Sequence, residues 1–138
     1  MKEILRNVLA LLAAALVAGV LIGLIQTISI KLYPPPPGFD FSDKAAVAKH
    51  AATLPVTAFL IVLASYLVGV TVGAWLACKL SVTEHRRQGI MIGGLFFVAS
   101  IMNLSSFPHP LWFWGANLIV VPVGAWLGLR LAGVRREG

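Results

Sequence analysis

Four long runs of apolar residues dominate the chain, and none of them contains a charged side chain. They have 19 to 25 residues each and cover residues 8–30, 54–78, 88–107 and 111–129. A helix rises about 1.5 Å per residue, so runs of about 20 residues cross a hydrocarbon core of about 30 Å. The first run is also longer than the apolar region of a secretory signal, which has about 7–15 residues. The pattern predicts four membrane-spanning helices, the first of them retained.

The longest polar segment, residues 31–53, separates the first two runs. Its four consecutive prolines, residues 34–37, predict a short extended polyproline segment. Ser42 stands at the N-cap position of an alanine-rich stretch, residues 44–53, which ends before Pro55. We therefore expect a short helix at the membrane interface between the first two spans.

The two remaining connections are short, and two of the spans resemble each other. Residues 79–87 are brief and basic, and residues 105–110 are few enough to make the last two spans antiparallel neighbours. Residues 70–80 and 121–131 are identical at seven of eleven positions. This indicates two tandem helical hairpins within one domain, residues 1–138. The alternative is that the match reflects composition, because membrane helices use a limited set of residue types.

Composition and charge exclude several classes of protein. Hydrophobic residues make up 59% of the chain and charged residues 12%, with a mean hydropathy of +0.90, which excludes a soluble domain. Eight of the eleven Lys and Arg lie at the N-terminus, in residues 79–87 and after the last run; the others are Lys31, Lys44 and Lys49. This distribution predicts cytoplasmic termini rather than a nucleic-acid-binding face.

Glycine pairs at i, i+4 spacing occur in every span. They are Gly19 and Gly23, Gly69 and Gly73, Gly89 and Gly93, and Gly124 and Gly128. Such pairs let helix backbones approach closely in lipid. The grooves are used either within one bundle or between copies in a homo-oligomer, and the sequence leaves both open.

Aromatic and cationic residues mark the ends of two spans. Trp75 and Lys79, like Trp126 and Arg130, lie one helical turn apart. Tryptophan favours the headgroup region and the long cations reach toward water, so membrane lipid is the expected partner.

Polar residues within the spans gather in the half that the charge distribution assigns to the outside. The candidate ligand-binding residues there are Gln26, Tyr66, Asn103, His109, Trp112, Phe113 and Asn117. They form either a shallow pocket or hydrogen bonds between helices. No span contains an ionisable Asp, Glu, Lys, Arg or His, and the single cysteine is Cys78. We therefore expect no catalytic residue, metal site or cofactor.

Two segments carry a resemblance. The Tyr-Pro-Pro-Pro-Pro-Gly sequence of residues 33–38, and Asn103-Leu104 leading to Pro-His-Pro-Leu-Trp-Phe-Trp at 108–114, resemble a family of small, uncharacterised bacterial inner-membrane proteins with four helices. The resemblance implies a bacterial inner membrane and supplies no activity. Four-span multidrug transporters differ, because they need a glutamate within the first span and Glu3 lies before it.

Together these features predict an all-α, non-enzymatic integral membrane protein. It would act as a self-associating structural or interaction protein, or would bind a lipid-like or small apolar ligand in its outer half. The alternative is a small oligomeric transporter or channel, which would lack an intramembrane carboxylate for proton coupling.

Overall fold

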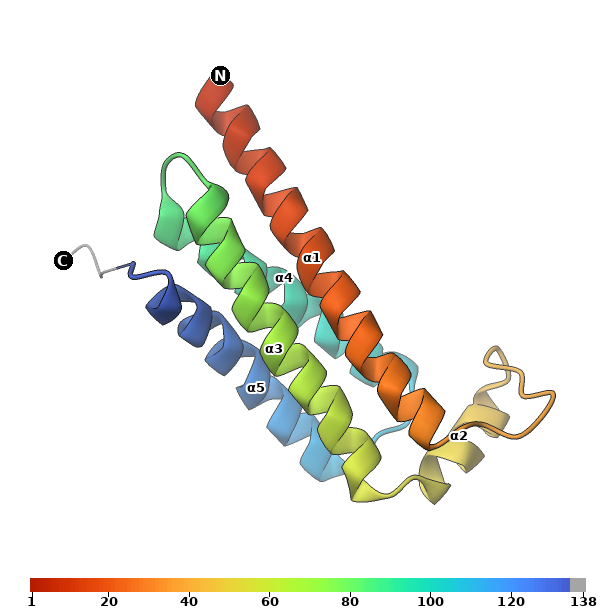
Figure 1. Cartoon of the computed structure of the whole chain (residues 1–138). Helices are drawn as coiled ribbons and strands as arrows, with labels where there is room; N and C mark the ends of the chain where they lie inside the picture. The colour runs from red at the N-terminus through yellow and green to blue at the C-terminus, as the bar shows by residue number, and fades with distance from the viewer. Residues whose placement is uncertain (135–138) are drawn as a thin grey trace.

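The computed structural model describes residues 1–134, and these fold into helices joined by short connections. The helices within that range are α1 (Lys2–Leu32), α2 (Lys44–Thr53), α3 (Val56–Leu80), α4 (His85–Ser106) and α5 (Leu111–Leu131). Four of these, all except α2, are long and apolar enough to cross a membrane. The predicted all-α, four-span fold with a short helix between the first two spans is confirmed (Figure 1).

The helix ends differ from the ends of the apolar runs. α1 begins at Lys2 and α4 at His85, ahead of the predicted residues 8 and 88. Lys, Arg and Glu are good helix formers, so the helices continue past the apolar run into the polar boundary. α3 instead begins two residues late, because Pro55 is its N-cap and the residue before a proline disfavours helical geometry.

The cap of α2 is a correction to the prediction. Asp43, not Ser42, is the N-cap, and its carboxylate accepts hydrogen bonds from the backbone N–H groups of Ala45 at 3.0 Å and Ala46 at 3.3 Å. Ser42 is occupied elsewhere, since its hydroxyl donates to Asp40 at 2.6 Å. The Asp43 carboxylate lies one residue closer than the Ser42 hydroxyl to the free amides of the first turn, and it satisfies two of them.

The central helix of the bundle is α3, which packs against α1, α4 and α5 (Figure 1). Small residues allow these contacts. A Cβ atom added at Gly73 would lie 2.8 Å from the Cβ of Ala18 in α1, and one at Gly128 would lie 2.6 Å from the carbonyl oxygen of Thr71 in α3. The α1–α3 and α3–α5 interfaces therefore rest on close backbone approach.

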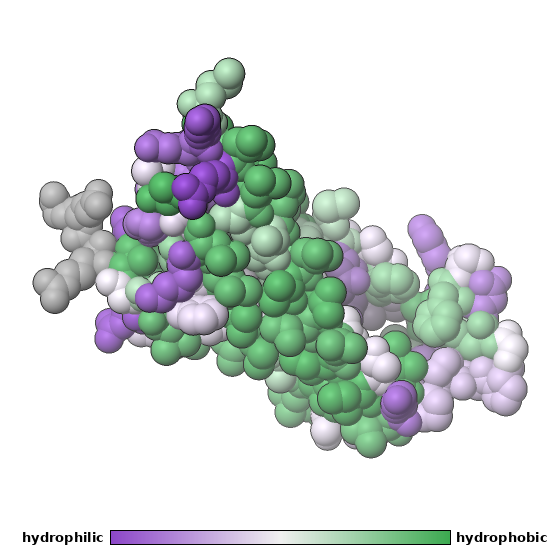
Figure 2. Space-filling model, turned by 45° about the horizontal axis from the view of Figure 1, so that its top comes forward, coloured by the Kyte–Doolittle hydropathy of each residue, from purple (hydrophilic) through white to green (hydrophobic). Residues whose placement is uncertain are grey.

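The outer surface of the bundle is suited to lipid. In Figure 2 hydrophobic side chains cover the middle of the visible face, and hydrophilic residues gather toward the two ends. We call one of these the basic end; it holds the start of α1, the α3–α4 connection and the end of α5. The other is the proline-loop end, with the segment after α1, α2 and the α4–α5 connection.

The two similar segments have similar environments. Val70 and Val121 are both buried, and Trp75 and Trp126 are both exposed. The guanidinium of Arg130 lies 5.0 Å from the centroid of the Trp126 ring, which is a cation–π distance. An internal repeat remains a prediction, since similar burial is also expected of any two helices of similar sequence.

Candidate functional site

The seven candidate ligand-binding residues lie on α1, α3, α4, α5 and the α4–α5 connection, toward the proline-loop end. The structure does not join them into one polar group. It brings them into two hydrogen-bonded pairs, one aromatic cluster and one isolated amide, each of which involves different neighbours.

The first pair joins α1 to α3. The amide Nε2 of Gln26 donates to the hydroxyl oxygen of Ser65 at 3.1 Å, and that hydroxyl donates to the Val62 carbonyl at 2.6 Å. Ser65 is fully buried and was not among the predicted residues. A signal was available, because Ser65 precedes Gly69 by one helical turn and so shares the glycine face that packs on α1.

The second pair joins α4 to α3. The amide Nδ2 of Asn103 lies 3.4 Å from the hydroxyl oxygen of Tyr66, at the long limit of a hydrogen bond. Tyr66 is buried, with its ring in a cluster that includes Val70 and Val121. This contact is of the kind that holds neighbouring helices together.

The aromatic cluster joins the start of α3 to the α4–α5 connection and the first turn of α5, at the proline-loop end. The His109 ring stacks on Phe113 with centroids 4.9 Å apart, and Phe59 from α3 lies 6.0 Å from Trp112 and 5.5 Å from Phe113. The Nδ1 atom of His109 donates to the Phe107 carbonyl at 2.7 Å, which fixes the ring over Phe113. Phe59 was missed by the sequence analysis because it lies about 50 positions before this loop.

Asn117 is the isolated amide. Its side chain is fully buried, and neither its oxygen nor its nitrogen has a hydrogen-bond partner within residues 1–134. It lies on the inner face of α5, one turn from the buried residues Phe113 and Val121. A buried amide without partners costs about 1–3 kcal/mol, so this position needs an explanation beyond packing.

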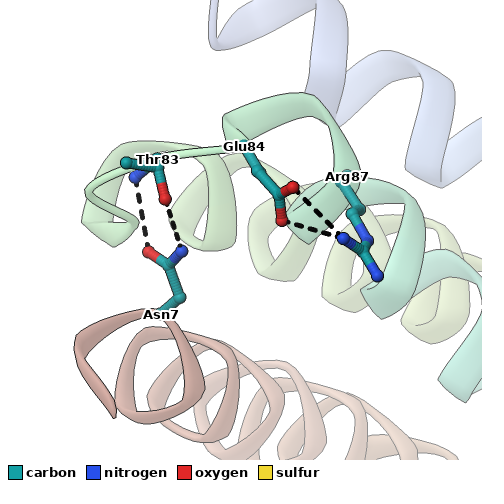
Figure 3. A network of polar contacts seen from close by, with 4 residues as sticks. All are labelled: Asn7, Thr83, Glu84 and Arg87. Carbon is teal, nitrogen blue, oxygen red and sulfur yellow. Dashed lines mark hydrogen bonds and ion pairs between the residues drawn. The ribbon is translucent and has the colours of Figure 1, made fainter. Parts of the chain in front are cut away.

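A further polar cluster, at the basic end, was missed entirely. The Asn7 carboxamide of α1 accepts from the backbone N–H of Val82 at 2.9 Å. It also accepts from the backbone N–H of Thr83 at 3.4 Å and donates to the Thr83 hydroxyl at 2.8 Å (Figure 3). Beside it, Glu84 and Arg87 form an ion pair at 3.0 Å. Asn7 therefore fixes the start of α1 to the α3–α4 connection.

Comparison with protein-family models, with curated proteins and with solved structures finds no match for the chain. The length and hydropathy of four helices indicate a multi-pass membrane protein, and a more specific activity has to be argued from the geometry.

Proposed function

We propose that this protein is a non-enzymatic integral membrane protein that associates with further copies of itself through the outward face of α1. The observation that carries the proposal is the contrast among the eight paired glycines. The six in α3, α4 and α5 each have atoms of another helix within 4 Å of a Cβ position, whereas Gly19 and Gly23 have no such neighbour.

The open pair belongs to a continuous row on α1. Leu12, Leu16, Gly19, Gly23 and Thr27 follow at spacings of three or four residues, on the side of the helix opposite the buried Ala14 and Ala18. The Thr27 hydroxyl donates to the Gly23 carbonyl at 2.8 Å, so it presents no unpaired donor to lipid. A second backbone can approach this row as closely as α5 approaches α3.

The position of α1 in the bundle supports the same reading. α1 packs almost entirely on α3, and only four of its residues are buried, compared with eleven in α3. Leu12 and Leu16 are 60% and 69% exposed. Large apolar side chains beside a glycine groove supply the dispersion contacts that drive helix association in lipid.

We further propose that the basic end faces the cytoplasm of a bacterium. Eight of the eleven Lys and Arg belong to this end or to the residues that follow α5. This distribution supports the orientation through the positive-inside rule, and the assignment to an inner membrane rests on the family resemblance.

Self-association is tested by measuring stoichiometry by native mass spectrometry in mild detergent. The Gly19→Leu/Gly23→Leu variant should weaken association about tenfold or more, because two leucines fill the groove. The control is Gly94→Leu/Gly115→Leu, which also fills two open, exposed glycine positions. A wild-type protein that is monomeric throughout, or equal association of both variants, overturns the proposal.

A second candidate function is the binding of a small ligand near the proline-loop end, and the unpaired amide of Asn117 favours it. A ligand or ordered water that reaches this amide would supply the missing hydrogen bonds. Native mass spectrometry should then find a bound small molecule that Asn117→Leu abolishes and Ser100→Ala keeps, since the Ser100 hydroxyl already bonds to the Phe97 carbonyl. A wild type without bound molecules, and without flux in reconstituted vesicles, excludes both this function and the transport alternative.

A further inference from the structure

A cleft of about 840 Å³ opens at the basic end, between the last turn of α3, the first turn of α4 and the segment that follows α5. Its volume lies within the range of about 300–1,000 Å³ that is typical of small-molecule sites. None of the seven candidate ligand-binding residues lines it, so the cleft is separate from that site; Lys79, which the sequence analysis placed at the membrane boundary, does line it.

Positive charge dominates the polar wall of this cleft. Lys79, Arg86 and Arg87 line it together with a single carboxylate, that of Glu84. The carboxylate is engaged by Arg87 at 3.0 Å, in the one ion pair found within residues 1–134. Lys79 and Arg86 thus retain their charge without an acidic partner in the described chain.

The start of α4 adds backbone donors to the same wall. Glu84 occupies the N-cap with a left-handed backbone (φ 52°, ψ 39°), and its side chain makes no capping hydrogen bond. The first amides of α4 therefore lack the acceptor that a cap would provide, and the positive end of the helix dipole lies at the cleft. Side-chain cations and backbone N–H groups converge there, which is an arrangement suited to an oxyanion.

This wall is held in place before any ligand arrives. The Asn7 contacts fix Val82 and Thr83, directly ahead of the first turn of α4, and Figure 3 shows those with Thr83. The Nδ1 atom of His85, another lining residue, donates to the Cys78 carbonyl at 2.9 Å, which fixes the orientation of the His85 ring at the start of α4. Backbone donors held in this way lose little conformational entropy on binding.

Part of the lining is apolar, and we call this part the apolar wall. Ile90, one turn after Arg86 on α4, is 48% exposed, and Ala132 and Val134 come from the segment that follows α5. The cleft lies at one end of the apolar helices, where a membrane-spanning bundle meets the lipid headgroups. An occupant that matches both walls has an anionic phosphate group attached to an acyl chain.

We propose that this cleft binds the phosphate headgroup of an anionic membrane lipid, with the phosphate between Lys79, Arg86 and the first amides of α4 and the acyl chain along Ile90. The apolar wall distinguishes this occupant from free phosphate, which would gain nothing from it. Basic pockets between membrane helices are known to accept anionic headgroups. This inference is independent of the proposed self-association, because that proposal concerns the apolar outward face of α1 and this one concerns a basic cleft formed by α3, α4 and the segment after α5.

The test is a titration of delipidated wild-type protein, in native mass spectrometry, with phosphatidylglycerol, phosphatidylcholine and inorganic phosphate. Phosphatidylglycerol should bind about tenfold more tightly than phosphatidylcholine, and Lys79→Gln/Arg86→Gln should remove the difference. The matched control, Lys2→Gln/Arg6→Gln, removes two charges from the same end but outside the cleft and should keep it.

A variant that binds the lipid more tightly than the wild type provides a test that partial unfolding cannot mimic. Glu84→Gln removes the one carboxylate and frees Arg87, so this variant should bind phosphatidylglycerol more tightly than the wild type. Equal effects of the two double variants would show general surface charge and overturn the proposal. Saturation by inorganic phosphate without any preference for phosphatidylglycerol would overturn the assignment to lipid.

Discussion

Asn7 and Thr83 are 76 positions apart in the sequence, and their side chains form a hydrogen bond of 2.8 Å at the boundary of the apolar bundle. The oxygen of the same carboxamide also accepts hydrogen bonds from the backbone N–H groups of Val82 and Thr83. One residue of α1 therefore satisfies three polar groups of the α3–α4 connection. The close packing of α1 on α3 holds the rest of the helix, and the Asn7 contact fixes its first turns to the α3–α4 connection.

The first prediction concerns this contact. Asn7→Leu should lower the free energy of unfolding by about 1–2 kcal/mol, because it leaves the amides of Val82 and Thr83 without their acceptor. Chemical unfolding in detergent micelles measures the change. Thr83→Val removes only the side-chain partner and should cost less; equal losses in both variants would contradict the view that the backbone bonds matter most.

Close packing of glycine gives the second prediction. Gly73→Leu and Gly124→Leu should each destabilise the protein by a few kcal/mol, since added side chains would meet Ala18 and the Leu67 carbonyl respectively. Gly94→Leu is the control, because nothing lies within 4 Å of its Cβ position. Parental unfolding curves for the first two variants would place these glycines at the lipid-facing surface and refute the interfaces described above.

Orientation can be measured by cysteine labelling, with one adjustment that the structure requires. Cys78 is only 3% exposed, so its failure to react would say nothing about the side of the membrane. In a Cys78→Ala background, an impermeant maleimide added to intact cells should label Gly38→Cys and leave Lys2→Cys unlabelled until the membrane is opened. The reverse pattern would invert the proposed topology.

The fourth prediction is a pH dependence in the proline-loop segment. The Ser42 hydroxyl, and then the Ser42 backbone N–H, donate to Asp40 and hold the pKa of its carboxyl below the ordinary value of 3.8. This turn is therefore stabilised above the ordinary pKa, and the stabilisation is lost as the pH falls through the lowered pKa. Ser42→Ala should raise the Asp40 pKa toward 3.8, as followed by carbon NMR of the carboxyl group.

A control for that experiment lies in the same segment. The Thr53 hydroxyl bonds to the His50 carbonyl at 2.6 Å and makes no contact with Asp40, so Thr53→Ala should leave the titration unchanged. If Ser42→Ala left it unchanged as well, the hydrogen bond to Asp40 would have no energetic role.

The sequence predicted the spans well because length and the absence of charge are local properties. The sequence predicted less where a contact depends on which of two neighbouring residues makes it, or on a partner far away in the chain. Ser42 was a sound N-cap by residue type, yet Asp43 one position later binds two amides. Whether a glycine pair packs inside the bundle depends on how α1 is rotated, and nothing local distinguishes Gly19 from Gly69.

Candidate polar residues show the same limit. Helical position placed Gln26, Asn103 and Asn117 in one half of the bundle, and the structure agrees. Their partners follow from the rotation of each helix, which directs Gln26 to Ser65 and leaves Asn117 alone among apolar residues. The basic cleft could not be predicted, because residues 132–134, which follow α5, lie far along the chain from residues 78–90, which form the rest of its lining.

The central place of α3 has a consequence for how the protein can vary. On one side Gly69 and Gly73 face α1, and on another Thr71 and Ala74 face the backbone of Gly128, so nearly every turn of α3 meets a neighbour. A larger residue at Gly69 or Gly73 would meet atoms of α1, so it could be accommodated only if the two helices moved apart. The tolerance of this chain to substitution should therefore be lowest in its second span and highest at open positions outside the α1 row, such as Gly94 and Gly115.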